Sequence, residues 1–553
     1  MFGPLEVAPG PVGSVVLFVF MVKWRLLTLP QPICMRRAKL ILDQMRSTQE
    51  IAAWLIKSGV QPDEIKLITI EPLAYQLTQI GRHRPTSDDR ITGTKLAIPP
   101  TSFLRQATCQ RRYSHIAMNT PLHWNLPDHH LPDHWLNIAA LVRDEYPLPR
   151  DGKTGSDMSH DQLARIYSEE CARIEGLEGK YGKDEFISIP GPVMDQLRKY
   201  RPAPLVRAAA YEKALGYKGR IFYKTEAGNP SGSHKPNTAI PQVYYAKEQG
   251  LRGVVTDTGA GQWGTALAMA CQTFGLECNV FMTHGSYVDK PYRRHMMTLA
   301  GGKVHSSPST LTKKGRELLA SDPDHAGSLG IGMSEAMEMA TESEDVRLCL
   351  GCMSYHAALH QTVIGLELVQ QLEMAGVTPD ALIACVGGGT NFFGFVAPYL
   401  KAKLQGSSGG PLLVAAESAN APALTQGEYR YDYADSFRYT PQYKMFTLGH
   451  EFIPPRVHAG GLRYHGKSAI LSLMAHQGHV HGVAIPQEEA FQAAKEFFLA
   501  EGALPAPETA HAIAATARIA KQHTSEDKQT DLVFCFSGTG YLDLIGYAKV
   551  FDL

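Results

Sequence analysis

Lys235 lies in the stretch NPSGSHKPNTAI, residues 229–240, after a run of small polar residues and directly before Pro236. A lysine amine that is removed from water loses its proton more readily and can then form a Schiff base. Pro236 suits the first turn of a helix, because no backbone N–H is needed there, and such a helix would fix the backbone beside Lys235. Taken alone, a lysine is more often a solvated surface residue, so the assignment depends on other stretches.

A glycine-rich turn follows the apolar run in ALIACVGGGTNFFGF. Glycines let successive backbone N–H groups point at one anion, and the helix that the following residues predict adds its dipole. The spacing fits neither a dinucleotide-binding loop nor a Walker A loop. The stretch therefore predicts a phosphate cradle, with a plain strand-to-helix turn as the alternative. Its residues are Gly387, Gly388, Gly389, Thr390 and Asn391.

Two further loops follow apolar runs. TDTGAGQWG, residues 256–264, offers backbone donors and hydroxyls that suit a substrate carboxylate, and Asp257 at its edge could exchange protons with a bound group. The alternative for Asp257 is a cap of the following helix. VFCFSGTGYLDL ends an apolar run at Ser537, and Gly538 and Gly540 keep that loop compact. A lysine, a phosphate cradle and a hydroxyl suited to a ring nitrogen together favour pyridoxal phosphate.

The elements that position these loops form a repeating pattern from about residue 202 onward. Short apolar runs end in Gly, Ser or Thr and several precede helical patterns, which predicts a parallel sheet with helices on both faces and ligand loops at the carboxyl ends of its strands. The runs are RIFYKTEA, GVVTDTG, CNVFMTH, ALIACVGGG, LLVAAES and DLVFCFSGTG. Residues 1–112 lack this pattern and are interpreted as an N-terminal extension of unknown role.

Composition bounds the class of protein. The 553 residues are 44% hydrophobic, which allows two or three domains with a large core. Lysine plus arginine equals aspartate plus glutamate, 54 each, so no net charge draws the chain to nucleic acid or to a membrane surface. The apolar run at residues 14–22 is too short to span a bilayer. We expect a cytoplasmic protein, with organelle targeting by the extension as the open alternative.

Metal-binding patterns are weak. Cys349 and Cys352 form a single CxxC among nine cysteines, and one pair without a second favours reduced, buried thiols over zinc. The sequence LPDHHLPDHW carries three histidines without the helical spacing of a metal site, so a structural loop is the preferred interpretation. They are His129, His130 and His134. No side-chain metal site is predicted.

The chain resembles the tryptophan synthase beta chain family over about residues 120–552. The motifs are RPAPLVRA, GNPSGSHKPNTA, TDTGAGQWG, CVGGGTNFFGF, EGALPAPETAHA and SGTGYLDL. The stretches KPYRRHMM, GSLGIGMSEA, GEYRYD and AGGLRYHG are similar to the second, beta-like subfamily. The resemblance implies an α/β enzyme of fold type II with pyridoxal phosphate between two domains, each a largely parallel twisted sheet flanked by helices. The mobile N-terminal domain would comprise residues 113–200 and 234–358, and the phosphate-cradle domain residues 201–233 and 359–553.

The resemblance also implies roles for residues. Lys235 would form the internal aldimine, and Ser537 would face the pyridine nitrogen. His234 would join the cradle in holding the phosphate, and Glu501 would lie near the cofactor ring. The substrate carboxylate would be held by Thr258, Gly259, Ala260, Gly261 and Gln262. The family further implies a monovalent cation, K⁺ or Na⁺, held by backbone carbonyls, and a homodimer; an alpha-chain partner is left open.

The implied reaction joins L-serine and indole to give L-tryptophan and water through an aminoacrylate. Two positions depart from the main subfamily. Asp257 replaces a glutamate, which shortens the reach of the carboxylate by one methylene. Arg463 stands where the main subfamily has aspartate, and it either pairs with a carboxylate in a closed state or binds the phosphate of O-phosphoserine. A different nucleophile, such as a phenol or thiol, is the alternative that Asp257 motivates, and a non-catalytic protein that kept the fold is a third interpretation.

Overall fold

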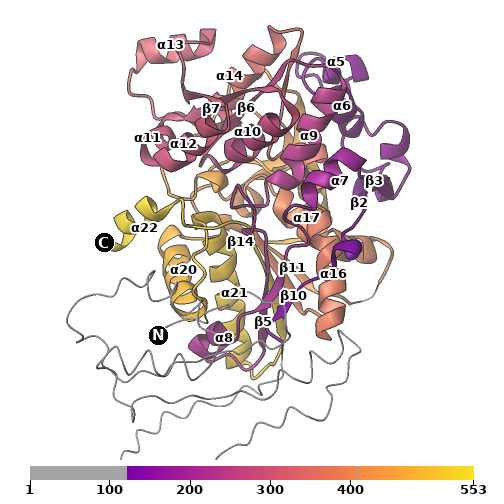
Figure 1. Ribbon diagram of the computed structural model, residues 1–553, viewed down its shortest axis with the longest axis vertical. Coiled ribbons are helices and arrows are strands. Elements are labelled where there is room, and N and C mark those ends of the chain that lie inside the picture. Colours follow the sequence, from indigo (N-terminus) through magenta and orange to yellow (C-terminus); the bar gives the residue numbers. More distant parts are fainter. Residues whose placement is uncertain (1–120, 408) are drawn as a thin grey trace, which may run out of the picture. The chain divides into compact units, whose positions relative to one another are not determined.

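The structure is a computed structural model that describes residues 121–407 and 409–553 (Figure 1). The predicted N-terminal extension and the apolar run at residues 14–22 lie outside the described residues. Within the described part of the chain, no helix combines the length and the apolar character needed to cross a membrane.

The larger sheet has seven strands in the order β1-β4-β5-β15-β10-β11-β14. The strands from β5 to β14 are parallel, whereas β1 and β4 join antiparallel at one edge. Their bounds are β1 His123–Trp124, β4 Leu205–Arg207, β5 Arg220–Thr225, β15 Asp531–Phe536, β10 Ala381–Cys385, β11 Leu412–Ser418 and β14 His481–Ile485.

Helices cover both faces of this sheet, and its central strands are therefore buried on both sides. In β10, Leu382 and Ala384 pack into one core cluster, whereas Ile383 packs into the other. The first cluster includes residues of α16 (Val363–Ala375) and α17 (Thr390–Leu404). The second includes residues of α8 (Ala209–Leu215), α20 (Gln487–Glu501) and α21 (Pro507–Ser525), which lie together in Figure 1.

The smaller sheet has four parallel strands in the order β8-β7-β6-β9. They are β8 Lys303–Ser307, β7 Glu277–Thr283, β6 Gly253–Thr258 and β9 Val346–Leu348. Successive side chains of a strand point to opposite faces. Thr256 and Thr258 accept hydrogen bonds from α10 (Gln262–Phe274), whereas the Cβ of Asp257 faces Gly332 of α14 (Leu329–Thr341). These two helices therefore cover opposite faces of the small sheet.

The remaining elements connect and flank these sheets. The strands are β2 His134–Leu136, β3 Phe186–Ser188, β12 Glu428–Tyr433 and β13 Gln442–Thr447. The longer helices are α6 Glu169–Glu175, α7 Gly191–Leu197, α9 Pro236–Glu248, α12 Pro291–Leu299, α13 Lys313–Ser321, α19 Ala469–His476 and α22 Leu544–Phe551. The shorter ones are η3 Asp128–His130, α4 Ile138–Leu141, α5 His160–Ala164, η4 Gly179–Gly182, α11 His284–Asp289, α15 Tyr355–His360, α18 Ala423–Gln426 and η5 Gly460–Leu462.

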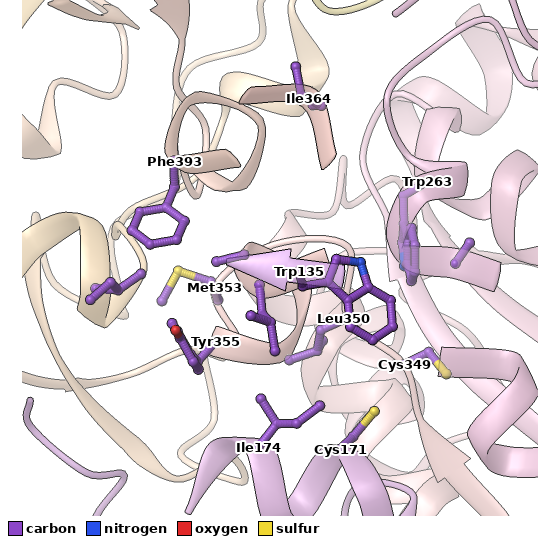
Figure 2. Close-up of a cluster of buried hydrophobic side chains, with 14 of the residues drawn as sticks. Trp135, Cys171, Ile174, Trp263, Cys349, Leu350, Met353, Tyr355, Ile364 and Phe393 are labelled. Carbon is purple, nitrogen blue, oxygen red and sulfur yellow. The ribbon is translucent and has the colours of Figure 1, made fainter. Parts of the chain in front are cut away.

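One hydrophobic cluster joins the two sheets. Figure 2 shows part of it, with Trp135 of β2, Leu350, Tyr355 and Trp263 drawn among the surrounding helices. Trp263 and Leu350 belong to this cluster and also line the cavity described below. The core therefore forms one wall of the cavity, which gives that wall a fixed shape.

The predicted α/β class is confirmed. Each of the six apolar runs forms a strand, and the strands lie in two largely parallel sheets with helices on their faces. The predicted helix after Lys235 is also present, with Pro236 at its first position. The LPDHHLPDHW segment forms η3 and β2, and His134 pairs with the neighbouring Asp133.

Candidate active site

A cavity lies where the carboxyl ends of strands from both sheets meet. The loops after β6, β10 and β15 all contribute to its wall, as does the start of α9. It is lined by His234, Lys235, Asp257, Thr258, Gly259, Ala260, Gln262, Trp263, Leu329, Leu350, Gly351, Cys352, Cys385, Gly387, Gly388, Gly389, Thr390, Asn391, Gly461, Leu462, Glu508 and Ser537. Residues as far apart in sequence as His234 and Ser537 thus share one site.

Lys235 lies immediately before α9, and its Nζ donates a hydrogen bond to the carbonyl oxygen of Gly351 at 2.6 Å. Burial lowers the pKa of the Lys235 amine, although the neighbouring Cys352, Cys385, Glu508 and Asp257 act in the opposite direction. A lowered pKa increases the neutral fraction of the amine, which is the form that acts as a nucleophile or base.

Asp257 lies near the end of β6 and is 6% exposed. Burial raises the pKa of its carboxyl to about 7, and the nearby Lys235 only partly offsets this effect. At neutral pH the carboxyl therefore exists in both protonation states, which suits a group that gives and takes a proton. Asp257 does not cap the following helix, which was its alternative role, because the N-cap residue of α10 is Gly261.

The glycine-rich turn, residues 387–391, leads from β10 into α17. Gly389 is the N-cap of α17 and has a φ of 103°, a left-handed conformation that favours glycine. A Cβ at Gly387 would meet the carbonyl oxygen of Gly461 at 2.2 Å, so only glycine allows this close approach. The first N–H groups of a helix have no carbonyl of that helix to reach, so the turn presents free donors and a positive dipole end to the cavity.

His234 adds a donor beside this turn. Burial, together with the neighbouring Lys235, holds the pKa of its imidazole well below the usual range, so the ring is neutral at neutral pH. Its Nδ1 is buried and has no hydrogen-bond partner among the described residues. Leaving a buried polar atom unsatisfied is costly, which fits a ring that faces a ligand.

Ser537 follows β15 directly. Its hydroxyl lies 2.8 Å from the hydroxyl of Thr509 and 3.4 Å from the sulfur of Cys385. Its carbonyl oxygen accepts the backbone N–H of His234 at 3.0 Å. This hydrogen bond connects the loop of Ser537 with the loop of Lys235, so the serine hydroxyl and the lysine amine keep fixed positions relative to each other.

The loop at residues 258–262, here called the carboxylate loop, runs from β6 into α10. Gly261 has a φ of 92°, which favours glycine, and a Cβ there would also meet Arg293. The Gln262 side-chain amide donates to one oxygen of Glu508 at 3.0 Å, and the Gly461 N–H donates to the other at 2.8 Å. Glu508 thus joins the carboxylate loop to the segment that packs against the cradle.

The structure corrects the prediction for Glu501. That residue ends α20, outside the cavity, and its carboxylate accepts the backbone N–H of Tyr211 at 2.8 Å. Glu508 lines the cavity instead, because α21 begins at Pro507 and its first turn faces the site. The signal in the sequence was the proline, which favours the first position of a helix and so places Glu508 in the first turn.

Arg463 is also placed differently from the prediction. Gly461 and Leu462 line the cavity described above, whereas Arg463 lines a separate cavity. The Arg463 guanidinium donates a hydrogen bond to the carbonyl oxygen of Pro454 at 2.8 Å. The two cavities share no lining residue. The structure therefore does not bring Arg463 to the other predicted substrate-binding residues.

Besides Glu508, the residues of the cavity wall that were not assigned from the sequence include Cys352, Cys385 and Trp263. Cys352 and Cys385 both line it, and burial raises the pKa of each thiol to about 11, so both are protonated at neutral pH. The Trp263 indole N–H donates to the Thr256 hydroxyl at 2.7 Å. These side chains are apolar or weakly polar, and their types alone carry no chemical signal.

Among the described residues, no group of three or more His, Cys, Asp or Glu side chains could hold a metal ion.

The family comparison accounts for this arrangement. Residues 197–538 match the family model described as pyridoxal-phosphate dependent enzyme. That range contains every strand end that lines the cavity. The chain is therefore a pyridoxal-phosphate dependent enzyme of fold type II.

Curated relatives define the family more narrowly. The chain is 47% identical over 423 residues to tryptophan synthase beta chain 2 of Thermotoga maritima, which covers 76% of this chain and 99% of the relative. It is 46% identical over 428 residues to the protein of the same name from Methanothermobacter thermautotrophicus, covering 77% of this chain and 98% of that relative. The Aquifex aeolicus protein of that name is 44% identical, over 77% of this chain and 97% of the relative. The chain belongs to the tryptophan synthase beta chain family, as the sequence motifs predicted.

Proposed function

We propose that this protein catalyses a β-replacement that joins L-serine and indole to give L-tryptophan and water. The observation that carries the proposal is the single cavity that holds the Lys235 amine, the glycine cradle and Ser537 together with the carboxylate loop. The relatives named tryptophan synthase beta chain 2 match over nearly their whole length, and the family match at residues 197–538 includes all the residues that line the cavity.

The residues present fit pyridoxal phosphate. The cradle at residues 387–391 and the unpartnered Nδ1 of His234 provide donors for the phosphate, and Ser537 offers a hydroxyl to the ring nitrogen. When bound, pyridoxal phosphate supplies the electron sink that allows the substrate to lose its α proton and its β hydroxyl. A serine hydroxyl is a weak acid, so Ser537 leaves the ring nitrogen largely unprotonated and favours elimination over transamination.

Lys235 would hold the cofactor and then accept the α proton of the substrate on Nζ. Burial lowers the pKa of this amine, so Nζ can take that proton at neutral pH. The carbonyl oxygen of Gly351 accepts a hydrogen bond from Nζ and aims the amine into the cavity.

Asp257 would donate a proton in the first part of the reaction, when water leaves, and accept one in the second part, when indole adds. The serine hydroxyl needs a proton to leave as water, and the ring carbon of indole releases one after it has bonded to the substrate. A carboxyl with a pKa of about 7 can donate the first proton and accept the second. One oxygen of Asp257 would serve both steps, provided that both partners come within its reach.

The carboxylate loop would hold the substrate. Its backbone N–H groups precede and open α10, and the positive end of that helix attracts a carboxylate. Glu508 keeps the loop in place through Gln262. The apolar walls formed by Leu329, Leu350 and Trp263 suit a flat aromatic nucleophile and exclude water.

The remaining predictions stay proposals: the two-domain division, roles of individual site residues, the monovalent cation, the homodimer and an alpha-chain partner. O-phosphoserine as the donor is not favoured, because Arg463 lies outside the cavity in this structure. A phenol or thiol nucleophile remains the second enzymatic hypothesis, and the shorter carboxylate of Asp257 motivates it.

The test is a serine titration of the cofactor-loaded enzyme followed by absorbance spectroscopy, then addition of indole, phenol or a thiol. We expect serine to change the cofactor spectrum, indole to reverse the change fastest, and tryptophan to appear by chromatography. Lys235→Ala should bind cofactor without the absorbance band of the lysine adduct. A faster reversal by phenol or thiol would contradict the proposed acceptor, and no spectral change with serine would contradict the reaction class.

A further inference from the structure

The Ser537 hydroxyl contacts two side chains that come from different parts of the larger sheet and its helices. Its oxygen lies 2.8 Å from the hydroxyl oxygen of Thr509 and 3.4 Å from the sulfur of Cys385. Thr509 belongs to the first turn of α21 and Cys385 ends β10, and both are buried. A hydroxyl has one proton to donate, so the direction of these two hydrogen bonds decides what Ser537 can offer to a ligand.

The hydrogen bond between Thr509 and Ser537 has a preferred direction. The backbone N–H of Gly538 donates to the Thr509 hydroxyl oxygen at 3.1 Å, and an N–H can only donate. The Thr509 proton then has two acceptors within reach, the Ser537 hydroxyl at 2.8 Å and the Gly538 carbonyl oxygen at 3.3 Å. The shorter distance favours Ser537. A hydroxyl that accepts one hydrogen bond also becomes a better donor, which strengthens this direction.

The contact between Cys385 and Ser537 has the same direction. The side-chain amide of Asn391 donates to the Cys385 sulfur at 3.7 Å, and this N–H also can only donate. Burial raises the pKa of the Cys385 thiol to about 11, so the sulfur keeps its proton at neutral pH and can donate it to the Ser537 oxygen. Both lone pairs of that oxygen therefore have a donor.

We propose that Thr509 and Cys385 are positioning residues that fix Ser537 as a hydrogen-bond donor toward the ring nitrogen of pyridoxal phosphate. With both lone pairs of its oxygen occupied, Ser537 can only give its proton to the cavity. A protonated ring nitrogen would find no acceptor in Ser537, and a buried donor without an acceptor is costly. This inference rests on the proposed role of Ser537.

The two residues would thereby set the protonation state of the ring nitrogen without touching the substrate. An unprotonated nitrogen makes the weaker electron sink, which favours loss of the β hydroxyl over transamination. Removing the Thr509 hydroxyl frees one lone pair of Ser537, and that lone pair can then accept the N–H of a protonated ring. The expected consequence is a ring nitrogen that takes up a proton at higher pH.

The test is nuclear magnetic resonance of the enzyme loaded with pyridoxal phosphate that carries ¹⁵N in its ring, recorded as a function of pH without substrate. We expect Thr509→Val to raise the apparent pKa of the ring nitrogen by about one pH unit, which corresponds to one net hydrogen bond. Thr509→Ser keeps the hydroxyl and should restore the original titration. In the Ser537→Ala protein the apparent pKa should also be raised, and adding Thr509→Val should then change nothing further.

Thr516→Val is the matched control. Thr516 lies in the same helix and is also buried, but its hydroxyl donates to the carbonyl oxygen of Ala512 at 2.8 Å, so the ring nitrogen should titrate as in the unmodified protein. If Thr509→Val does not fold, Cys385→Ala tests the second donor and should raise the apparent pKa by a smaller amount, because a thiol is a weak donor.

An unchanged titration in Thr509→Val, or in Cys385→Ala where that variant replaces it, would overturn the proposal. An equal effect of Thr509→Val with and without Ser537 would also overturn it, because the effect would not pass through the serine. No change in Ser537→Ala would reject the role of Ser537 together with this inference. The measurement uses no serine or indole, so none of these outcomes decides whether the enzyme forms tryptophan.

Discussion

The two oxygens of the Glu508 carboxylate connect Gln262 of the carboxylate loop with Gly461 of the wall segment, at 3.0 Å and 2.8 Å. Glu508 itself is 4% exposed and lies in the first turn of α21, which packs on the larger sheet. One carboxylate thus holds together pieces that come from both sheets. Its contacts define a positioning role that can be tested separately from the chemistry at Lys235.

Replacing Glu508 with alanine should raise the KM for serine more than it lowers kcat. The change leaves two buried donors without an acceptor, each at a cost of about 1–3 kcal/mol, and frees the carboxylate loop. We expect a KM increase of about tenfold or more, because about 1.4 kcal/mol corresponds to a factor of ten. Steady-state kinetics with serine as the varied substrate measure it.

Glu501→Ala is the control for Glu508→Ala. It also removes a carboxylate that accepts a backbone N–H, but outside the cavity, at Tyr211. This variant should lose some stability and keep the KM for serine. A larger KM effect for Glu501→Ala than for Glu508→Ala would contradict the placement of these two residues.

These two glutamates show where sequence reasoning stopped. The strand ends, the glycine cradle and Lys235 could be predicted, because each combines an apolar run with glycines or with a proline that starts a helix. Glu501 and Glu508 lie in the same motif, and the turn between α20 and α21 decides which carboxylate faces the cavity. That turn depends on how the two helices pack, which short-range sequence patterns do not record.

Arg463 shows a second limit. Its backbone neighbours line the active-site cavity, so its sequence position predicted a substrate contact. The side chain lines a separate cavity instead, because η5 ends at Leu462 and the chain turns there. Cys352 and Cys385 were missed for a different reason: buried thiols have the same sequence signature in a core and in a cavity wall.

Asp257 should make the stability of the protein depend on pH. Its folded-state pKa of about 7 lies above the ordinary aspartate value of 3.8, so the unfolded chain releases this proton at lower pH than the folded protein does. The folded state is therefore penalised increasingly as pH rises from about 4 to about 7, and the penalty is constant above that range. Asp257→Asn removes the penalty.

We expect the free energy of unfolding of Asp257→Asn, relative to that of the unmodified protein, to increase by about 1.4 kcal/mol per pH unit between pH 5 and pH 7. Denaturant titrations of the cofactor-free proteins at pH 5, 6, 7 and 8 measure it. Groups common to both proteins cancel in the difference. A difference that stays flat across this range would show that the Asp257 carboxyl ionises normally in the folded state.

Asp257→Glu should reduce kcat with serine and indole, although it restores the residue that the main subfamily has. The Cβ of Asp257 lies close to Gly332, where an added Cβ would come within 3.3 Å of it, so the side chain leaves β6 against α14 and one more methylene moves the carboxylate oxygens to a different position. A displacement of about 1 Å in a proton-transfer group can cost about a hundredfold in rate. Pre-steady-state kinetics of the indole step measure the change.

The contrary outcome for Asp257→Glu is equally informative. A kcat for indole that rises well above that of the unmodified protein would mean that the aspartate serves another nucleophile. Running the same variant with phenol and with a thiol separates these cases, because a site adapted to one of them should lose that activity when the carboxylate is lengthened.

Arg201 should be the most sensitive charged residue for stability. Its guanidinium is fully buried and pairs with Glu226 at 2.7 Å and with Glu367 at 2.8 Å. Lys224, which is also fully buried, pairs with Glu367 at 2.6 Å. Arg201 further donates to the side chain of Asn237 at 2.9 Å, in the first turn of the helix that follows Lys235. Arg201→Met would leave a carboxylate buried without its main partner.

We expect Arg201→Met to lower the free energy of unfolding by about 3–5 kcal/mol, as is found when one member of a buried ion pair is removed. It should also weaken retention of the cofactor, because Asn237 helps to fix the start of α9, which follows Lys235.

Arg518→Met, which breaks the partly exposed pair with Glu489, should cost less than about 1 kcal/mol and leave the cofactor in place. Denaturant titration gives the stabilities, and cofactor release during dialysis gives the second readout. Equal stability losses in the two variants would show that the buried cluster around Arg201 contributes no more than a surface pair, and loss of stability without cofactor release would separate the cluster from the positioning of Lys235.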